Sequence, residues 1–311
     1  MKYVFLVGCP RSGTTWLQVL LAQHGQVATA RETHLFNGYL KHLDRWWRFF
    51  ESQPDNVGLK VLFSPDEYYK LCSLFVHGVM QKIAASNPTA TVVLEKTPNH
   101  VRYAPLILKL VPDAYFIHIV RDPRSVVSSL CAAGRSWGAS WASRSTLSNA
   151  RLWCQDVTRG RAIGGLTDRF REVRYEDLRG TRGTDVLHDL YTWLELPGDR
   201  QVASRALDAC EITRLRDGGT GVRAFDSVKP RDPVFFRKGA TDGWKQDLSP
   251  RDIRVVEYAA EALMQEYGYL PDQTTRGQRP LRVAVRDFID RVESQVRRHT
   301  DATFRKLRAV C

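Results

Sequence analysis

A short apolar segment followed by a glycine-bounded loop and a helix constrains this sequence most. Residues 3–7 are typical of a buried strand, and the run GCPRSGTTW follows over residues 8–16. Gly8 and Gly13 stand five positions apart, as in the G-x-x-x-x-G-K-[ST] loop that binds phosphates. From Thr14 onward, apolar residues recur at helical spacing as far as Gly25. Backbone N–H groups in such a turn converge on an anion, and the helix dipole adds positive charge.

The loop differs from its nucleoside-triphosphate form at one position. The lysine that reaches the β- and γ-phosphates is absent, because Thr14 stands there and the cation lies earlier, at Arg11. The loop therefore favours a nucleotide with a short 5′ tail over ATP or GTP. A glycine turn that binds no ligand is the alternative.

Strand and helix signals alternate along the chain. Residues 91–94 and 115–120 are strand candidates separated by an amphipathic helix over 103–111, and residues 172–175 form a candidate last strand. Such alternation is typical of βαβ units. We predict an α/β fold of the P-loop nucleotide-binding type, with three α/β/α layers, a central parallel sheet, helical insertions and a C-terminal helix.

The end of the chain differs from the rest. Residues 1–270 are predicted to form the main domain, and residues 271–311 a basic amphipathic helical tail. One face of that helix would be apolar and the other rich in arginine; the apolar face comprises Leu281, Val285, Phe288, Ile289, Val292 and Val296. We expect the tail to pack on the body or to form a homodimer, with peripheral contact to an anionic membrane as the alternative.

Charge and cysteine usage narrow the function classes. Lys and Arg number 46 against 34 Asp and Glu, a net charge of +12, which suits an anionic ligand, a nucleic acid or an acidic surface. No nucleic-acid recognition motif is present, so we expect no nucleic-acid partner. No apolar run approaches the ~20 residues of a membrane span, and no signal segment is expected. The six cysteines are scattered, which favours reduced thiols, a cytoplasmic location and no metal site.

Two further basic segments lie downstream. Arg121 follows the 115–120 strand at its carboxyl end, where open α/β sheets bind ligands, and Ser129 lies two helical turns later. Arg237, Lys238 and Gly239 belong to a loop that also carries aromatic residues, which can cover a purine while the cations hold phosphate. Taken alone, each segment is also consistent with solvated basic residues.

In this order, these segments resemble the sulfotransferase family, which uses 3′-phosphoadenosine 5′-phosphosulfate (PAPS). Residues 10–16 resemble its 5′-phosphosulfate loop, residues 120–129 its 3′-phosphate segment, and residues 236–245 its R-K-G loop. The run RYEDL over 174–178 resembles an element whose tyrosine contacts adenine. The resemblance covers residues 3–270 and implies these cofactor-binding residues: Arg11, Ser12, Gly13, Thr14, Thr15, Trp16, Arg121, Ser129, Tyr175, Arg237, Lys238 and Gly239.

The sequence departs from the cytosolic branch of that family in two places. Arg11 replaces a lysine, as in bacterial and Golgi-type members, and Asp242-Gly243 reverses the usual order. The chain therefore resembles a bacterial member with both Golgi-type and cytosolic-type features.

Sulfuryl transfer needs a base for the acceptor hydroxyl, cations for the developing charge, and an acceptor in line with the sulfur. Arg11 and Lys96 are the predicted cations, and no metal is required. Lys96 resembles the lysine of a Lys-x-Pro segment in Golgi-type members. Glu32 is the predicted base, because it stands in a similar Glu-Thr context, and His34 is the alternative. In the alternative without a catalytic role, Lys96 is an exposed loop lysine and Glu32 only pairs with Arg31.

The sequence thus predicts a PAPS-dependent O-sulfotransferase. It would transfer a sulfuryl group to a hydroxyl of a small-molecule, glycan or lipid acceptor and release 3′,5′-adenosine bisphosphate (PAP). A P-loop kinase-like phosphotransferase is the alternative. The missing lysine of the loop argues against it, as does Arg121 where an acid that holds Mg²⁺ would end the strand.

Overall fold

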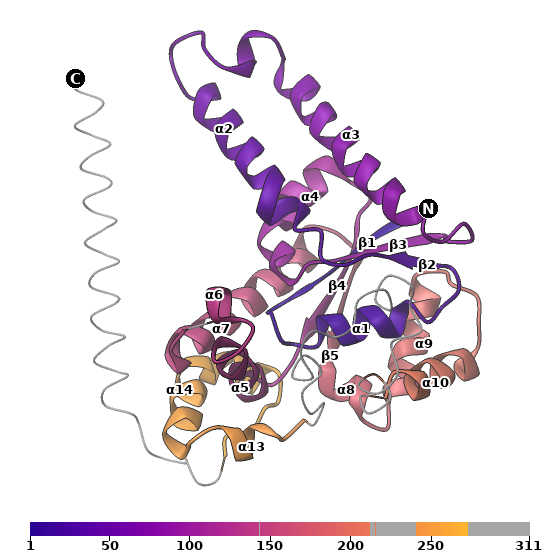
Figure 1. Cartoon of the computed structure of the whole chain (residues 1–311), viewed down its shortest axis with the longest axis vertical. Helices are drawn as coiled ribbons and strands as arrows, with labels where there is room; N and C mark the ends of the chain where they lie inside the picture. The colour runs from indigo at the N-terminus through magenta and orange to yellow at the C-terminus, as the bar shows by residue number, and fades with distance from the viewer. Residues whose placement is uncertain (143, 212–214, 216–240, 273–311) are drawn as a thin grey trace, which may run out of the picture.

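The computed structural model describes residues 1–142, 144–211, 215 and 241–272. At its centre is a five-stranded sheet in the order β2-β3-β1-β4-β5, with every neighbouring pair parallel (Figure 1). The strands are β1 Lys2–Gly8, β2 Val27–Thr29, β3 Val92–Lys96, β4 Tyr115–Val120 and β5 Phe170–Arg174. The predicted parallel α/β architecture is confirmed.

Helices cover both faces of the sheet, and the side chains of β1 alternate between the two faces. Val4 and Leu6 face the helices α1, α8, α9 and α10, whereas Phe5 and Val7 face α3 and α4 (Figure 1). These helices are α1 Thr14–Leu21, α3 Pro65–Ala84, α4 Ala104–Leu110, α8 Tyr175–Arg179, α9 Gly183–Trp193 and α10 Arg200–Ala209. The three predicted layers are therefore present.

A second group of helices packs beside the sheet. It consists of α5 Pro123–Gly134, α6 Ala139–Ala142, α7 Thr146–Ala162 and α14 Pro250–Glu266, preceded by the short α13 Trp244–Asp247. Ser249 Oγ accepts the Asp252 N–H and caps α14. The remaining short helices are η1 Leu35–Leu40, η2 Leu59–Val61, η3 Pro98–Tyr103 and η4 Ile163–Gly165.

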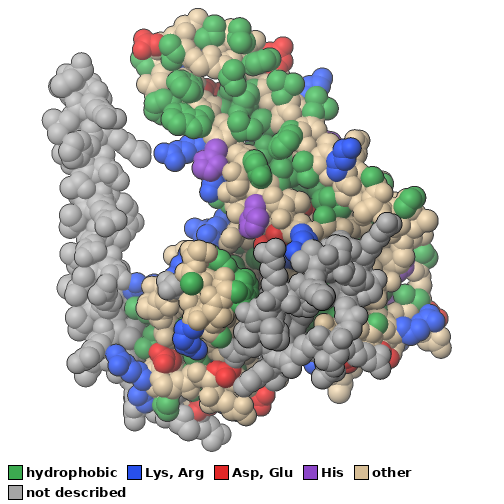
Figure 2. All heavy atoms as spheres, viewed as in Figure 1, with side chains coloured by type: hydrophobic (Ala, Val, Ile, Leu, Met, Phe, Trp, Pro, Cys, Tyr) green, Lys and Arg blue, Asp and Glu red, His purple; other side chains and the backbone are tan. Residues whose placement is uncertain are grey.

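A helical hairpin separates β2 from β3 in the chain and projects beyond the sheet (Figure 1). Its arms are α2 Lys41–Glu51 and α3, and Trp47 stacks on Tyr68 between them with ring centroids 4.1 Å apart. Figure 2 shows hydrophobic side chains gathered on this hairpin; the exposed ones include Leu43, Trp46, Phe49, Leu62 and Phe75. Within the described ranges, no helix combines the length and apolarity needed to traverse a bilayer.

The bounds of one predicted strand need correction, and one strand was missed. The predicted strand over 172–175 begins earlier, at Phe170, and ends before Tyr175, which opens α8. The strand β2 was not predicted. The tail beyond Asp272 and the Arg237-Lys238-Gly239 segment lie outside the described residues.

Candidate active site

The loop between β1 and α1 has the backbone of an anion cradle. Gly13 has a φ of 97°, which favours glycine, and a Cβ there would lie 2.5 Å from a ring carbon of Tyr175. Ser12 is fully buried, and its Oγ has no hydrogen-bond partner among the described residues. Because α1 starts at Thr14, its first N–H groups face the same loop. A buried hydroxyl beside a helix N-terminus fits a phosphate-sized anion.

Arg11 joins this loop to the segment after β4. Its Nε donates to Ser129 Oγ at 2.9 Å, across 118 positions of sequence, and its guanidinium lies 5.5 Å from the ring centroid of Trp137. The loop predicted to hold the 5′ end of the nucleotide therefore touches the segment predicted to hold its 3′-phosphate.

An aromatic group lies beside the glycine of the loop. The Tyr175 ring contacts Trp16 with centroids 5.4 Å apart, and the Arg121 guanidinium carbon lies 4.1 Å from the Tyr175 centroid. Burial raises the pKa of the Tyr175 hydroxyl, so this ring stays neutral and offers a flat face. Trp16 itself is buried, and its Nε1 donates to the Cys210 carbonyl. Its indole therefore anchors α1 in the core and supports Tyr175 from behind.

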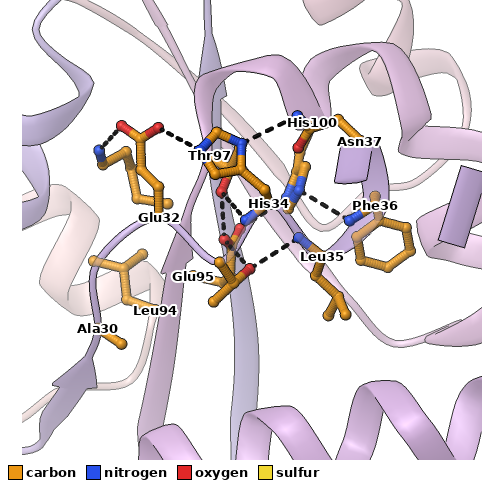
Figure 3. A network of polar contacts seen from close by, with 12 residues as sticks. Ala30, Glu32, His34, Leu35, Phe36, Asn37, Leu94, Glu95, Thr97 and His100 are labelled. Carbon is orange, nitrogen blue, oxygen red and sulfur yellow. Dashed lines mark hydrogen bonds and ion pairs between the residues drawn. The ribbon is translucent and has the colours of Figure 1, made fainter. Parts of the chain in front are cut away.

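The predicted base and cation meet at the end of β3. Lys96 Nζ lies 2.5 Å from Glu32 Oε1 and donates to Thr15 Oγ1 at 3.0 Å. Lys96 is only 2% exposed, whereas Glu32 is 35% exposed, so the carboxylate can meet an incoming molecule. His34 Nε2 lies 3.6 Å from Glu32 Oε2, on the other side of the carboxylate (Figure 3). Lys96 is thus a buried link between the loop and the predicted base, and not a solvated lysine.

Comparisons with known proteins identify the family of the chain. The profile of the family described as "Sulfotransferase family" matches residues 4–200, which is more than half of the chain. The chain belongs to the sulfotransferase family.

Among curated sulfotransferases, the protein-tyrosine sulfotransferase of Drosophila melanogaster is 27% identical over 130 residues, covering 42% of this chain and 25% of that protein. Protein-tyrosine sulfotransferase 1 of Mus musculus is 28% identical over 130 residues, covering 42% of this chain and 34% of its own length. The similarity therefore spans between a quarter and about a third of these relatives.

Two solved structures share the fold. The sulfotransferase domain from the curacin biosynthetic pathway aligns with a TM-score of 0.56 and 18% identity, covering 87% of this chain and 99% of that one. Mouse sulfotransferase SULT7A1, solved in complex with PAP, aligns with a TM-score of 0.56 and 14% identity, covering 85% of each chain. At these identities the likeness establishes the fold of this sulfotransferase and no more.

Residues 241–247 are anchored beside the second basic site of the sulfotransferase. Ser125 Oγ donates to the Thr241 carbonyl at 3.0 Å, and the Arg124 guanidinium lies 4.0 Å from the Trp244 centroid. Arg124 also pairs with Asp122 and Glu257, both at short range. These contacts fix the 241–247 segment against the start of α5. Thr241, which lies only two positions after Gly239 in the sequence, is therefore held next to the predicted 3′-phosphate segment.

Sequence reasoning missed a buried polar network behind the base. Glu95, Thr97 and His100 lie at and after the end of β3 and connect to the segment that carries Glu32 (Figure 3). The signal was present in the run EKTPNH, in which a carboxylate ends an otherwise apolar strand. Within the described ranges, no three His, Cys, Asp or Glu side chains form a group that could hold a metal ion.

Proposed function

We propose that this sulfotransferase transfers the sulfuryl group of PAPS to an acceptor hydroxyl, which makes it an O-sulfotransferase. The observation that carries the proposal is Lys96, whose ammonium contacts both Thr15 of the phosphate loop and the carboxylate of Glu32. One buried cation therefore joins the anion cradle to the base. PAPS, when bound, supplies the sulfuryl group and leaves as PAP.

The loop residues suit the 5′ end of this nucleotide. Ser12 offers its buried hydroxyl, Gly13 lets the backbone approach closely, and Thr14 and Thr15 add hydroxyls at the helix start. Arg11 supplies positive charge from within the loop.

The second basic segment suits the 3′-phosphate. Ser129 receives the hydrogen bond of Arg11, Arg121 lies over the Tyr175 ring, and that ring would contact the adenine. Arg237, Lys238 and Gly239 lie outside the described residues, and we propose them as contacts of the 3′-phosphate on the sequence motif alone. A nucleotide phosphorylated at both ends fits this pair of adjoining segments better than ATP.

The catalytic roles follow from exposure and charge. Glu32 Oε1 is occupied by Lys96, which leaves Oε2 to take the proton of the acceptor hydroxyl. Lys96 is positioned to balance charge that develops between the loop and the base. His34 is the alternative base, since it borders the same carboxylate.

The surface next to the base suggests an acceptor with apolar parts. Tyr39, Leu43 and Trp46 are all exposed and recur at helical spacing along η1 and α2, the elements that follow His34. We propose a small-molecule, glycan or lipid hydroxyl whose apolar portion lies against this stripe.

Binding and transfer test the proposal in two steps. A ligand that binds only the native state raises the melting temperature, so PAP should raise it more than 5′-AMP or ATP with Mg²⁺. A shift with ATP and Mg²⁺ alone would favour the phosphotransferase. A scan of phenols, tyrosine peptides, sugars and long-chain alcohols with PAPS, read by mass spectrometry, then identifies the acceptor.

A further inference from the structure

Three consecutive backbone N–H groups next to the proposed base are each held by a side chain. The His34 N–H donates to Thr97 Oγ1 at 3.3 Å, the Leu35 N–H to Thr33 Oγ1 at 3.2 Å, and the Phe36 N–H to His100 Nε2 at 3.2 Å. These three amides open the helix η1, where N–H groups have no partner within the helix.

The three acceptors converge on one carboxylate (Figure 3). Thr97 Oγ1 and Thr33 Oγ1 donate to Glu95 Oε1 at 2.7 and 2.8 Å, and His100 Nδ1 donates to Glu95 Oε2 at 2.8 Å. Each acceptor therefore receives a backbone N–H from the base segment and donates a proton of its own to Glu95. One side chain of β3 thus organises the backbone that follows Glu32.

The protonation state of this network follows from its connections. Because His100 Nε2 accepts the Phe36 N–H, its proton must lie on Nδ1, which makes His100 the neutral tautomer. Glu95 is buried, and burial alone would raise its pKa. The hydrogen bonds that Glu95 accepts from His100, Thr97 and Thr33 oppose burial and lower its pKa. Glu95 is therefore ionised and can only accept hydrogen bonds.

The backbone held by this network is not one that the chain adopts freely. His34 has a φ of 51°, in the left-handed region, which costs a non-glycine residue on the order of 1 kcal/mol. This bend turns the chain into the single π-helical turn η1. Glu32 precedes that bend by two residues and His34 forms it, so the placement of both depends on it.

We propose that Glu95, Thr33, Thr97 and His100 form a positioning clamp that keeps Glu32 in register with Lys96. Glu95 and Lys96 are consecutive on β3, so their side chains leave opposite faces of the strand. Glu95 fixes the backbone of the base segment while Lys96 meets the base itself. The catalytic consequence rests on the proposed function, whereas the structural consequence does not.

Glu95→Gln tests the clamp, because a glutamine keeps the volume of the side chain but loses its charge and one acceptor atom. We expect kcat for PAPS turnover to fall about 100-fold, since a misplacement of about 1 Å at a reacting group costs that much. The dissociation constant of PAP should stay within about twofold, because the phosphate loop is untouched. Hydrogen exchange should accelerate at the amides of residues 34–36. Turnover is followed with an acceptor from the scan, or with water if none is found.

Glu172→Gln is the matched control, since Glu172 also pairs with a buried histidine, His118, but on β5, on the other side of β1 from β3. It should lower the melting temperature without faster exchange at residues 34–36. Thr33→Val should reduce kcat about tenfold and Thr33→Ser should restore it, because only the hydroxyl matters. Combined with Glu32→Gln, Glu95→Gln should add little further loss, as expected when one residue acts through another.

The outcomes separate the two proposals. Unchanged exchange at residues 34–36 in Glu95→Gln would overturn the clamp, whatever the enzyme catalyses. Faster exchange with unchanged kcat would remove its role in positioning. Faster exchange with no PAPS turnover in the wild type would leave the clamp standing and refute the proposed function.

Discussion

The strands β3 and β4 flank β1 on opposite sides, and their carboxyl ends lie at the same end of the sheet. The side chains at these two ends make different contacts. The end of β3 places Lys96 on Glu32 and Glu95 under the base segment. The end of β4 places Arg121 over Tyr175, and the Asp122 N–H donates to Glu176 Oε1. Under the proposed function, the end of β3 serves proton transfer and the end of β4 binds the nucleotide. Substitutions at the two ends should therefore separate turnover from affinity.

The largest effect is expected at the β3 side. Glu32→Gln should lower kcat by about 10³-fold, because the amide cannot take the hydroxyl proton. PAP binding, measured by calorimetry, should stay within about twofold. Glu51→Gln, an exposed glutamate on α2, serves as the control and should change neither quantity. Unchanged turnover in Glu32→Gln would transfer the role of base to His34.

Acid should remove the contribution of Glu95, at the end of β3, to the stability of the protein. The hydrogen bonds that Glu95 accepts lower its pKa in the folded state, so the native state binds fewer protons than the unfolded one. Its contribution to the unfolding free energy is full above about pH 4.5 and is lost as the pH falls further. Urea unfolding of Glu95→Gln should show a flatter profile between pH 5 and 3; equal slopes would contradict the assignment.

Substitution at the end of β4 should change the affinity for the nucleotide. Arg121→Ala should weaken PAP binding about 30-fold, which is the loss of one or two charged hydrogen bonds. At saturating PAPS, kcat should change by less than about threefold. The affinity for 5′-AMP, which lacks the 3′-phosphate, should hardly change. Arg205→Ala on α10 is an exposed arginine control. A loss of equal size for PAP and 5′-AMP would move the 3′-phosphate site elsewhere.

The smallest effect is expected at Gly13, in the loop between β1 and α1. Gly13→Ala would place a methyl group 2.5 Å from the Tyr175 ring at a φ of 97°. It should lower the unfolding free energy by about 2 kcal/mol and weaken PAP binding. Gly25→Ala, where nothing lies within 4 Å, should cost less than about 0.5 kcal/mol. Equal melting temperatures for the two variants would mean that the Tyr175 ring can move aside for the added methyl group.

Sequence reasoning reached those features of the site that are local. The glycine-bounded loop between β1 and α1 and the strand ends near Lys96 and Arg121 each rest on a few adjacent residues. It missed β2, because Val27–Thr29 is too short to show alternation. It also missed the clamp, because Glu95 and Thr33 lie 62 positions apart and meet only through the sheet. The motif predicts that Trp16 contacts the cofactor, and this stays a prediction; the structure shows a buried side chain packed on the Tyr175 ring.

One measurement tests the central claim most directly. Stoichiometric enzyme is mixed with PAPS labelled on sulfur and a pool of hydroxyl acceptors, and the label is followed as it leaves the nucleotide. We expect the label to move to an acceptor in the wild type and to stay on the nucleotide in Glu32→Gln, although both proteins bind PAP equally. Label that never leaves the nucleotide in the wild type, with any acceptor or with water, would contradict the account.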